Sequence, residues 1–167
     1  MGDGFLDGYD GQTTAGLLAL RDRYRSDSLV LAFELGLQLK AEHSALSRAE
    51  QYVLAIEALE REVNNGGYGQ FFLNASNTYA AIVVEALFAI DCPKTARVTR
   101  GAIAALKLPE PMTPAGLEAR ILADDLTLRR ALHACDERYL ATGEAIADRL
   151  LAWIAAHAAD IVIPSRG

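Results

Sequence analysis

Residues 60–77 gather most of the side chains in this chain that could form a binding site. The segment contains three glycines, four asparagines, one glutamine and three aromatic residues, between two stretches of strongly helical composition. Amide, hydroxyl and carboxylate groups at this density indicate either a polar pocket or a hydrogen-bonded helix junction. The candidate residues are Glu60, Glu62, Asn64, Asn65, Gly66, Gly67, Tyr68, Gln70, Phe71, Phe72, Asn74 and Ser76.

Two interpretations of this segment stay open. In the first, its asparagines, Gln70, Tyr68 and Glu60 converge on a small ligand or on a side chain of a partner. In the second, the amide side chains pair with the backbone groups that helix ends leave without partners, while Phe71 and Phe72 fill the core. Glu60 and Glu62 fall in the last turns of a helix, where the helix dipole disfavours anions. We therefore expect hydrogen bonds to them, for example from backbone amides of the following turn.

The helix that leads into this segment has a clear beginning and a clear buried face. Ser47 to Glu50 form a capping box, which predicts a helix start near Arg48. Tyr52, Ile56, Leu59 and Val63 recur at helical spacing and predict the face that packs on the core. Asn65-Gly66-Gly67 is typical of a helix end.

The remaining sequence indicates more helices and no strand pattern. Helical periodicity predicts helices at about 13–25, 29–42, 78–90, 93–106, 113–123, 126–139 and 143–160. The segment 78–90 is apolar nearly all round, which predicts a buried central helix. We predict an all-α fold, with one compact domain of seven or eight helices over residues 13–163 and a flexible N-terminal arm over 1–12.

Composition excludes several classes of protein. With 167 residues and 51% hydrophobic residues, the chain can bury a real core. The longest apolar stretches fall far short of a membrane span, and the N-terminus lacks the pattern of a signal peptide. We therefore expect a cytoplasmic protein that does not bind membranes.

The net charge of −6 is concentrated in the first part of the chain. Residues 1–62 hold 11 acidic and 6 basic side chains, and this balance disfavours direct nucleic-acid binding and favours basic partners. These acidic residues form either a solvated surface or a surface for a partner. The candidates are Asp22, Asp27, Glu34, Glu42, Glu50 and Glu57.

No sequence pattern argues for catalysis, a metal or a cofactor. The three histidines, His43, His133 and His157, lack the spacing of metal ligands, and Cys92 and Cys135 form no CxxC pair. Lys94, Arg97 and Arg100 share one side of a predicted helix, which is typical of a solvated surface in an acidic chain.

The segment from Glu60 to Ser76 resembles the core signature of a bacterial domain-of-unknown-function family whose best-known member is a DNA-mimic protein. The signature follows the pattern E-x-N-N-G-G-[FY]-x-Q-[FY]-F-x-N-S, and the likeness covers most of the chain. The resemblance implies a compact helical fold, often as a homodimer, and no known catalysis.

For function, the resemblance implies a regulatory protein whose acidic surface imitates DNA and sequesters a DNA-binding transcription factor. The alternative is a small-molecule-binding or enzymatic domain that uses the turn from Asn64 to Asn74 as its pocket.

Overall fold

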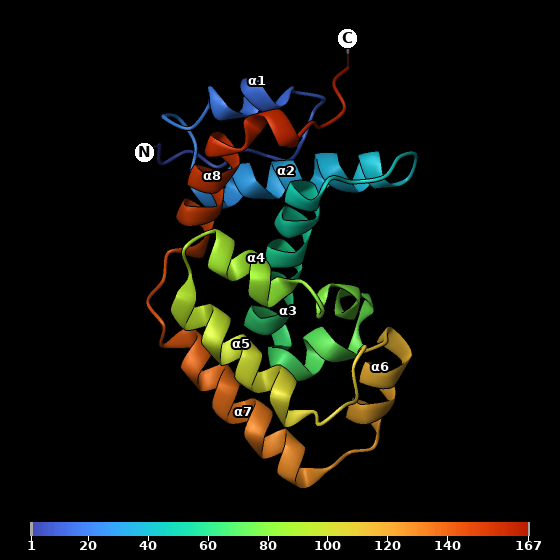
Figure 1. Cartoon of the computed structure of the whole chain (residues 1–167). Helices are drawn as coiled ribbons and strands as arrows, with labels where there is room; N and C mark the ends of the chain where they lie inside the picture. The colour runs from blue at the N-terminus through green and yellow to red at the C-terminus, as the bar shows by residue number, and fades with distance from the viewer. Residues whose placement is uncertain (1, 167) are drawn as a thin grey trace. The chain divides into compact units, whose positions relative to one another are not determined.

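The computed structural model describes residues 2–166, and its regular structure is helical (Figure 1). Within these residues an isolated bridge between Gly4 and Tyr24 is the one β-type pairing. The all-α prediction is therefore confirmed. The α-helices are α1 (Thr14–Leu18), α2 (Ser26–Ala41), α3 (Arg48–Leu73), α4 (Val83–Ala89), α5 (Pro93–Ala105), α6 (Pro114–Leu122), α7 (Leu126–Leu140) and α8 (Ile146–Ala156), and the 3₁₀ helices are η1 (Ala75–Tyr79) and η2 (Ala158–Asp160).

The first of two compact units comprises residues 1–57 and 145–167. In it, α8 lies against α2 although about a hundred residues separate them in the chain, and α1 also contacts α2 (Figure 1). Buried leucine and phenylalanine side chains of α2 and α8 form the core of this unit. Residues 2–6 run beside residues 21–28 through backbone and serine hydrogen bonds. Met1 of the predicted arm lies outside the described residues.

The second unit comprises residues 58–144 and contains the asparagine-glycine segment. Here α5 packs against both α4 and α7, and α6 packs against η1 (Figure 1). The carboxylate of Glu144 accepts hydrogen bonds from the backbone amides of Lys94 and Thr95. This contact caps α5 at the end where the helix dipole favours an anion.

The start and the buried face of α3 follow the sequence prediction. The helix begins at Arg48, and Ser47 and Glu50 exchange both hydrogen bonds of the capping box. Tyr52, Ile56 and Leu59 are buried, as the helical spacing predicts, and so is Val63. The helix end expected at Asn65–Gly67 is present as a break at Gly67, and a second helical stretch follows it and continues to Leu73, so α3 consists of two helices joined across a kink.

The apolar helix that we predicted over 78–90 is shorter in the structure. Residues 75–79 form a 3₁₀ helix, and α4 covers only Val83–Ala89. The side chains of Ser76 and Asn77 explain the difference, since they donate hydrogen bonds to the carbonyls of Phe71 and Phe72. These bonds satisfy the end of α3 and hold the next residues in a tighter turn.

Candidate functional site

The kink in α3 is built on a glycine that faces a carboxylate. Gly67 has φ 80° and ψ −178°, a backbone conformation that is open almost only to glycine. A Cβ atom at this position would overlap the Asp136 carboxylate. The same carboxylate accepts a hydrogen bond of 2.7 Å from the backbone amide of Tyr68. Gly67 therefore lets α7 satisfy an amide that the kink leaves without a helical partner.

Tyr68 is fully buried and anchors the segment to the core of its unit. Its hydroxyl lies 2.7 Å from the Thr99 hydroxyl, which donates its own hydrogen to the Thr95 carbonyl. Tyr68 is therefore the donor in the first of these bonds. Its ring meets the Tyr139 ring edge to face at 5.9 Å. Burial raises the pKa of the Tyr68 hydroxyl, so this side chain stays neutral.

Most of the polar side chains in the segment pair with one another. One oxygen of Glu62 accepts hydrogen bonds from Gln70 at 2.6 Å and from Asn74 at 2.9 Å. Asn64 donates to the backbone carbonyl of Glu60 at 2.7 Å. The partners of Glu62 are side-chain amides and not the backbone amides that we expected. These contacts agree with the interpretation of the segment as a hydrogen-bonded helix junction.

Glu60 differs from its polar neighbours because one of its carboxylate oxygens is buried and has no hydrogen-bond partner. Burial raises the pKa of the Glu60 carboxyl to about 7, although the Asn64 side chain works in the opposite direction. The second buried atom without a partner in this unit, among the residues described, is the Tyr139 hydroxyl oxygen. An ionised Glu60 is therefore costly to the fold at neutral pH.

A pocket of about 220 Å³ lies beside the kink. Gly66 and Gly69 line it together with three polar residues of α7, Arg129, His133 and Asp136. A Cβ at Gly69 would meet nothing within 4 Å. The amide side chains of the segment are absent from the described lining of this pocket. The pocket therefore uses the glycines of the segment and not its asparagines or Gln70.

The six acidic residues predicted as partner contacts all lie in the first unit, but they differ in exposure. Asp22, Asp27 and Glu42 are exposed, and Glu57 is half-buried. Glu34 and Glu50 are only 2% and 1% exposed. We therefore leave Glu34 and Glu50 out of any surface for a partner.

Glu50 is a buried residue whose hydrogen bonds join segments of its own unit. Its carboxylate accepts hydrogen bonds from the Lys40 ammonium group at 2.6 Å and from the backbone amide of Val162 at 2.9 Å, in addition to the capping box with Ser47. Burial alone would raise the pKa of Glu50, but these hydrogen bonds outweigh burial and lower it. Glu50 is therefore an ionised structural residue.

Further exposed carboxylates come from the segment that we predicted as an arm. Asp3 and Asp7 are exposed, and the hydrogen bonds of residues 2–6 place them beside the segments that carry Asp22 and Asp27. We call Asp3, Asp7, Asp22 and Asp27 the N-terminal acidic surface. Sequence reasoning missed Asp3 and Asp7 because no periodicity ties a glycine-rich segment to a neighbour.

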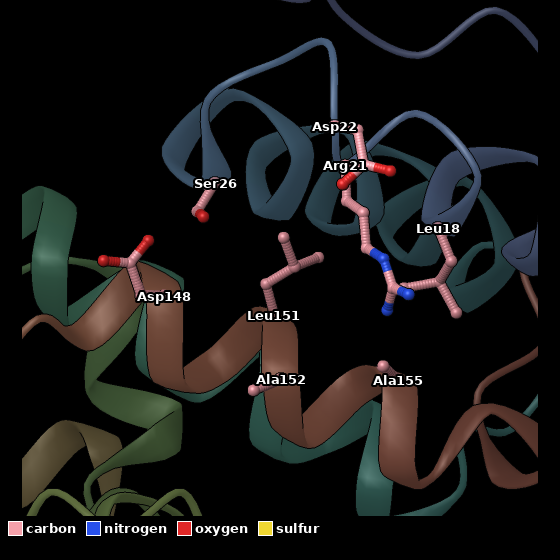
Figure 2. Close-up of a pocket in the computed structure, with 8 residues that line it drawn as sticks. All are labelled: Leu18, Arg21, Asp22, Ser26, Asp148, Leu151, Ala152 and Ala155. Atoms are coloured by element: carbon pink, nitrogen blue, oxygen red, sulfur yellow. The ribbon is translucent and has the colours of Figure 1, made fainter. Parts of the chain in front are cut away.

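Figure 2 shows a second pocket, of about 260 Å³, in the first unit. Its floor is apolar, and Leu151, Ala152 and Ala155 of α8 contribute to it. Asp148 lies at the first turn of α8, and the Arg21 side chain extends toward the opposite end of this floor (Figure 2). The pocket therefore presents opposite charges along an apolar surface.

The described residues contain no group of three or more side chains arranged to hold a metal ion. Cys92 and Cys135 are buried, and neither forms a disulfide bond. No helix in the described chain is both long and apolar enough to span a membrane.

The helical fold, the kinked α3 and the paired amide groups define a helical protein with a specific glycine-dependent junction. Residues 44–157 match the family described as DMP19-like protein, so the chain belongs to the DMP19-like protein family. The matched range contains the whole junction segment. Comparison with curated proteins and with solved structures gave no significant match.

Proposed function

We propose that this chain is a non-enzymatic regulatory protein that binds the DNA-contacting surface of a DNA-binding transcription factor. Carboxylates stand where the phosphates of DNA would lie. Membership in the DMP19-like family supports this proposal. The observation that carries it is the N-terminal acidic surface, where two adjoining segments carry four exposed aspartates.

The charge of the first unit sets the strength of such a contact. The unit holds 11 acidic and 7 basic side chains, a net charge of −4. Exposed Arg21, Arg23 and Arg25 lie between the acidic residues, and Arg25 pairs with Asp27. The surface therefore imitates a short stretch of phosphates, and its attraction for a basic partner weakens as salt screens it.

The proposal also includes the homodimer implied by the resemblance and a cytoplasmic location, where DNA-binding regulators act. Sedimentation velocity at several protein concentrations tests the dimer. A monomer at all concentrations would remove it from the proposal and would leave the acidic surface untouched.

Capture from a lysate of the source cell tests the function. The immobilised chain is loaded with lysate, eluted with rising salt and, in parallel, with duplex DNA, and the released proteins are identified by mass spectrometry. We expect a DNA-binding regulator that leaves at moderate salt and is displaced by the duplex. If duplex DNA displaces none of the captured proteins, the proposal is contradicted.

Two charge-matched variants make this experiment specific. The triple variant Asp3→Asn, Asp22→Asn, Asp27→Asn neutralises three carboxylates of the N-terminal acidic surface and should lose the regulator. The control variant Glu110→Gln, Glu118→Gln, Glu137→Gln removes the same charge from exposed positions of the second unit and should retain it. Equal losses in both variants would show that net charge acts without a defined surface.

A second candidate function is small-molecule binding in the pocket beside the kink. The observation that favours it is the open space at Gly69, which lines the pocket and where a Cβ would meet nothing within 4 Å. Gly69→Leu should fill the pocket and abolish the stabilisation by any ligand found in a thermal-shift screen. Gly101→Leu is the control, since Gly101 also has open space and lies away from the pocket. A ligand that stabilises the Gly69→Leu variant as much as the unchanged chain would exclude this pocket.

A further inference from the structure

A pocket of about 330 Å³ in the first unit has a chemistry that the proposed function does not use. It lies where residues 9–11, the end of α2 and residues 164–166 meet. Its lining includes the basic residues Lys40, His43 and Arg166 and the hydroxyl-bearing residues Tyr9 and Ser165. Such a gathering of hydrogen-bond donors is unexpected in a unit whose net charge is −4.

The Tyr9 hydroxyl is the most informative group in this pocket. Its oxygen is buried and has no hydrogen-bond partner in the structure. Burial raises the pKa of this hydroxyl, while the nearby Arg166 guanidinium opposes that shift. The group is therefore a neutral donor that lies close to a permanent positive charge. A buried donor of this kind costs free energy until an acceptor reaches it.

Arg166 is held in place, but N–H groups of its guanidinium remain available to a ligand. Its backbone amide donates to the Gly11 carbonyl at 3.1 Å, and its side-chain carbons pack against Gly11. Its guanidinium contacts Asp10 at 3.4 Å, and both side chains are more than 80% exposed. An exposed pair of this length contributes little. An anion that also accepts a hydrogen bond from Tyr9 would compete well with Asp10.

The other two basic groups complete the recognition of an anion. The Lys40 ammonium group bonds to Glu50 and to the Val162 carbonyl, so two of its three hydrogens are used and one remains. His43 also lines the pocket, and its exposed side chain lies 3.8 Å from Glu42. Leu39, which is 47% exposed, and Pro164 give the same pocket an apolar wall.

We propose that this pocket binds a small organic anion, with its carboxylate or phosphate group between Tyr9 and Arg166 and an apolar body against Leu39 and Pro164. The volume lies at the lower end of the range for small-molecule sites, which limits the body to about the size of one aromatic ring. This site is independent of the acidic surface and of the pocket beside the kink.

Titration of the ¹⁵N-labelled full chain with four probes tests the proposal. Phenyl phosphate and benzoate carry both features of the ligand, inorganic phosphate carries only the anion, and benzyl alcohol carries only the ring. We expect the amide signals of residues 9–11, 39–44 and 164–166 to shift with the first two probes, more weakly with phosphate, and not with benzyl alcohol. A preference between the first two probes would assign the anion as phosphate or carboxylate.

Three variants decide whether the contacts are the proposed ones. Tyr9→Phe removes only an unpaired hydroxyl, so the protein should still fold. The affinity for the anionic probes should fall roughly tenfold, which is the effect expected from losing one hydrogen bond to a charged group. Arg166→Gln should lower the affinity by at least as much. Arg25→Gln removes the same charge outside the pocket and should leave the affinity unchanged. Unshifted signals, or equal affinities of the Tyr9→Phe variant and the unchanged chain, would overturn the proposal.

Discussion

Replacing Glu60 with glutamine should stabilise the protein at alkaline pH and destabilise it at acidic pH. One oxygen of this carboxyl group is buried without a partner, and burial raises its pKa to about 7. The unfolded chain ionises Glu60 near its ordinary pKa of 4.5. Between these two values the folded state holds a proton that the unfolded state has released. The contribution of Glu60 to the free energy of unfolding therefore falls as the pH rises from about 4.5 to about 7, and it stays constant at higher pH.

The magnitude follows from the two pKa values. Each pKa unit corresponds to about 1.4 kcal/mol, so the ionised Glu60 costs the fold about 3 kcal/mol above pH 7. Glutamine has the same shape and no charge, but its new N–H group needs a partner, which offsets about 1–2 kcal/mol. This offset is the same at every pH because glutamine does not titrate, so we expect Glu60→Gln to gain about 1–2 kcal/mol at pH 8 and to lose about 1–2 kcal/mol at pH 4.5, a difference of about 3 kcal/mol.

Urea unfolding followed by far-UV circular dichroism, at several pH values from 4.5 to 8, measures this difference. Glu62→Gln is the contrast variant, because Glu62 accepts hydrogen bonds from both Gln70 and Asn74 and should lose stability when replaced. A stability difference between Glu60→Gln and the unchanged chain that does not vary with pH would refute the reasoning. That result would mean that the folded protein solvates the carboxylate.

Further variants test the junction and the first unit. Gly67→Ala should cost about 2 kcal/mol or more, because a φ of 80° strains an alanine and the new Cβ overlaps Asp136. Gly69→Ala should gain about 0.5–1 kcal/mol, because this helical position has open space for a Cβ. Thermal unfolding compares the two variants, and equal effects would contradict the kink. Glu50→Gln should cost about 2–4 kcal/mol at pH 7, because it breaks the buried ion pair with Lys40. This loss should shrink as the pH falls through the lowered pKa of Glu50. A loss that does not vary with pH in urea titrations would contradict the pairing. Tyr68→Phe should cost about 1 kcal/mol by removing its bond to Thr99, and an unchanged urea midpoint would show that the bond is not stabilising.

The parts of the fold that could be predicted from the sequence depend on neighbours within a few residues. The capping box of Ser47 and Glu50 and the buried stripe of α3 are such features, and both are confirmed. The start of α5 at Pro93 also follows from local preference. Helix positions fix these contacts before any tertiary packing.

The parts that escaped prediction depend on partners far away in the chain. We predicted Glu50 as one of the acidic residues for a partner, but it is buried and bonds to Lys40 and to the amide of Val162. The helix end at Gly67 was predictable, but its partner was not: the Asp136 carboxylate, which accepts the hydrogen bond from the Tyr68 amide, lies 68 residues further along the chain. The orphaned oxygen of Glu60 likewise arises from packing that no local pattern encodes.

The central claim is that exposed carboxylates of the first unit occupy the DNA-contacting surface of a regulator. The most direct measurement is competition by fluorescence anisotropy, with the captured regulator bound to its labelled duplex and the chain added in increasing amounts. The account predicts that the chain releases the duplex in a salt-dependent manner, and that the triple variant at Asp3, Asp22 and Asp27 does so far less well. A ternary complex that retains the duplex, or equal release by the triple variant, would contradict it.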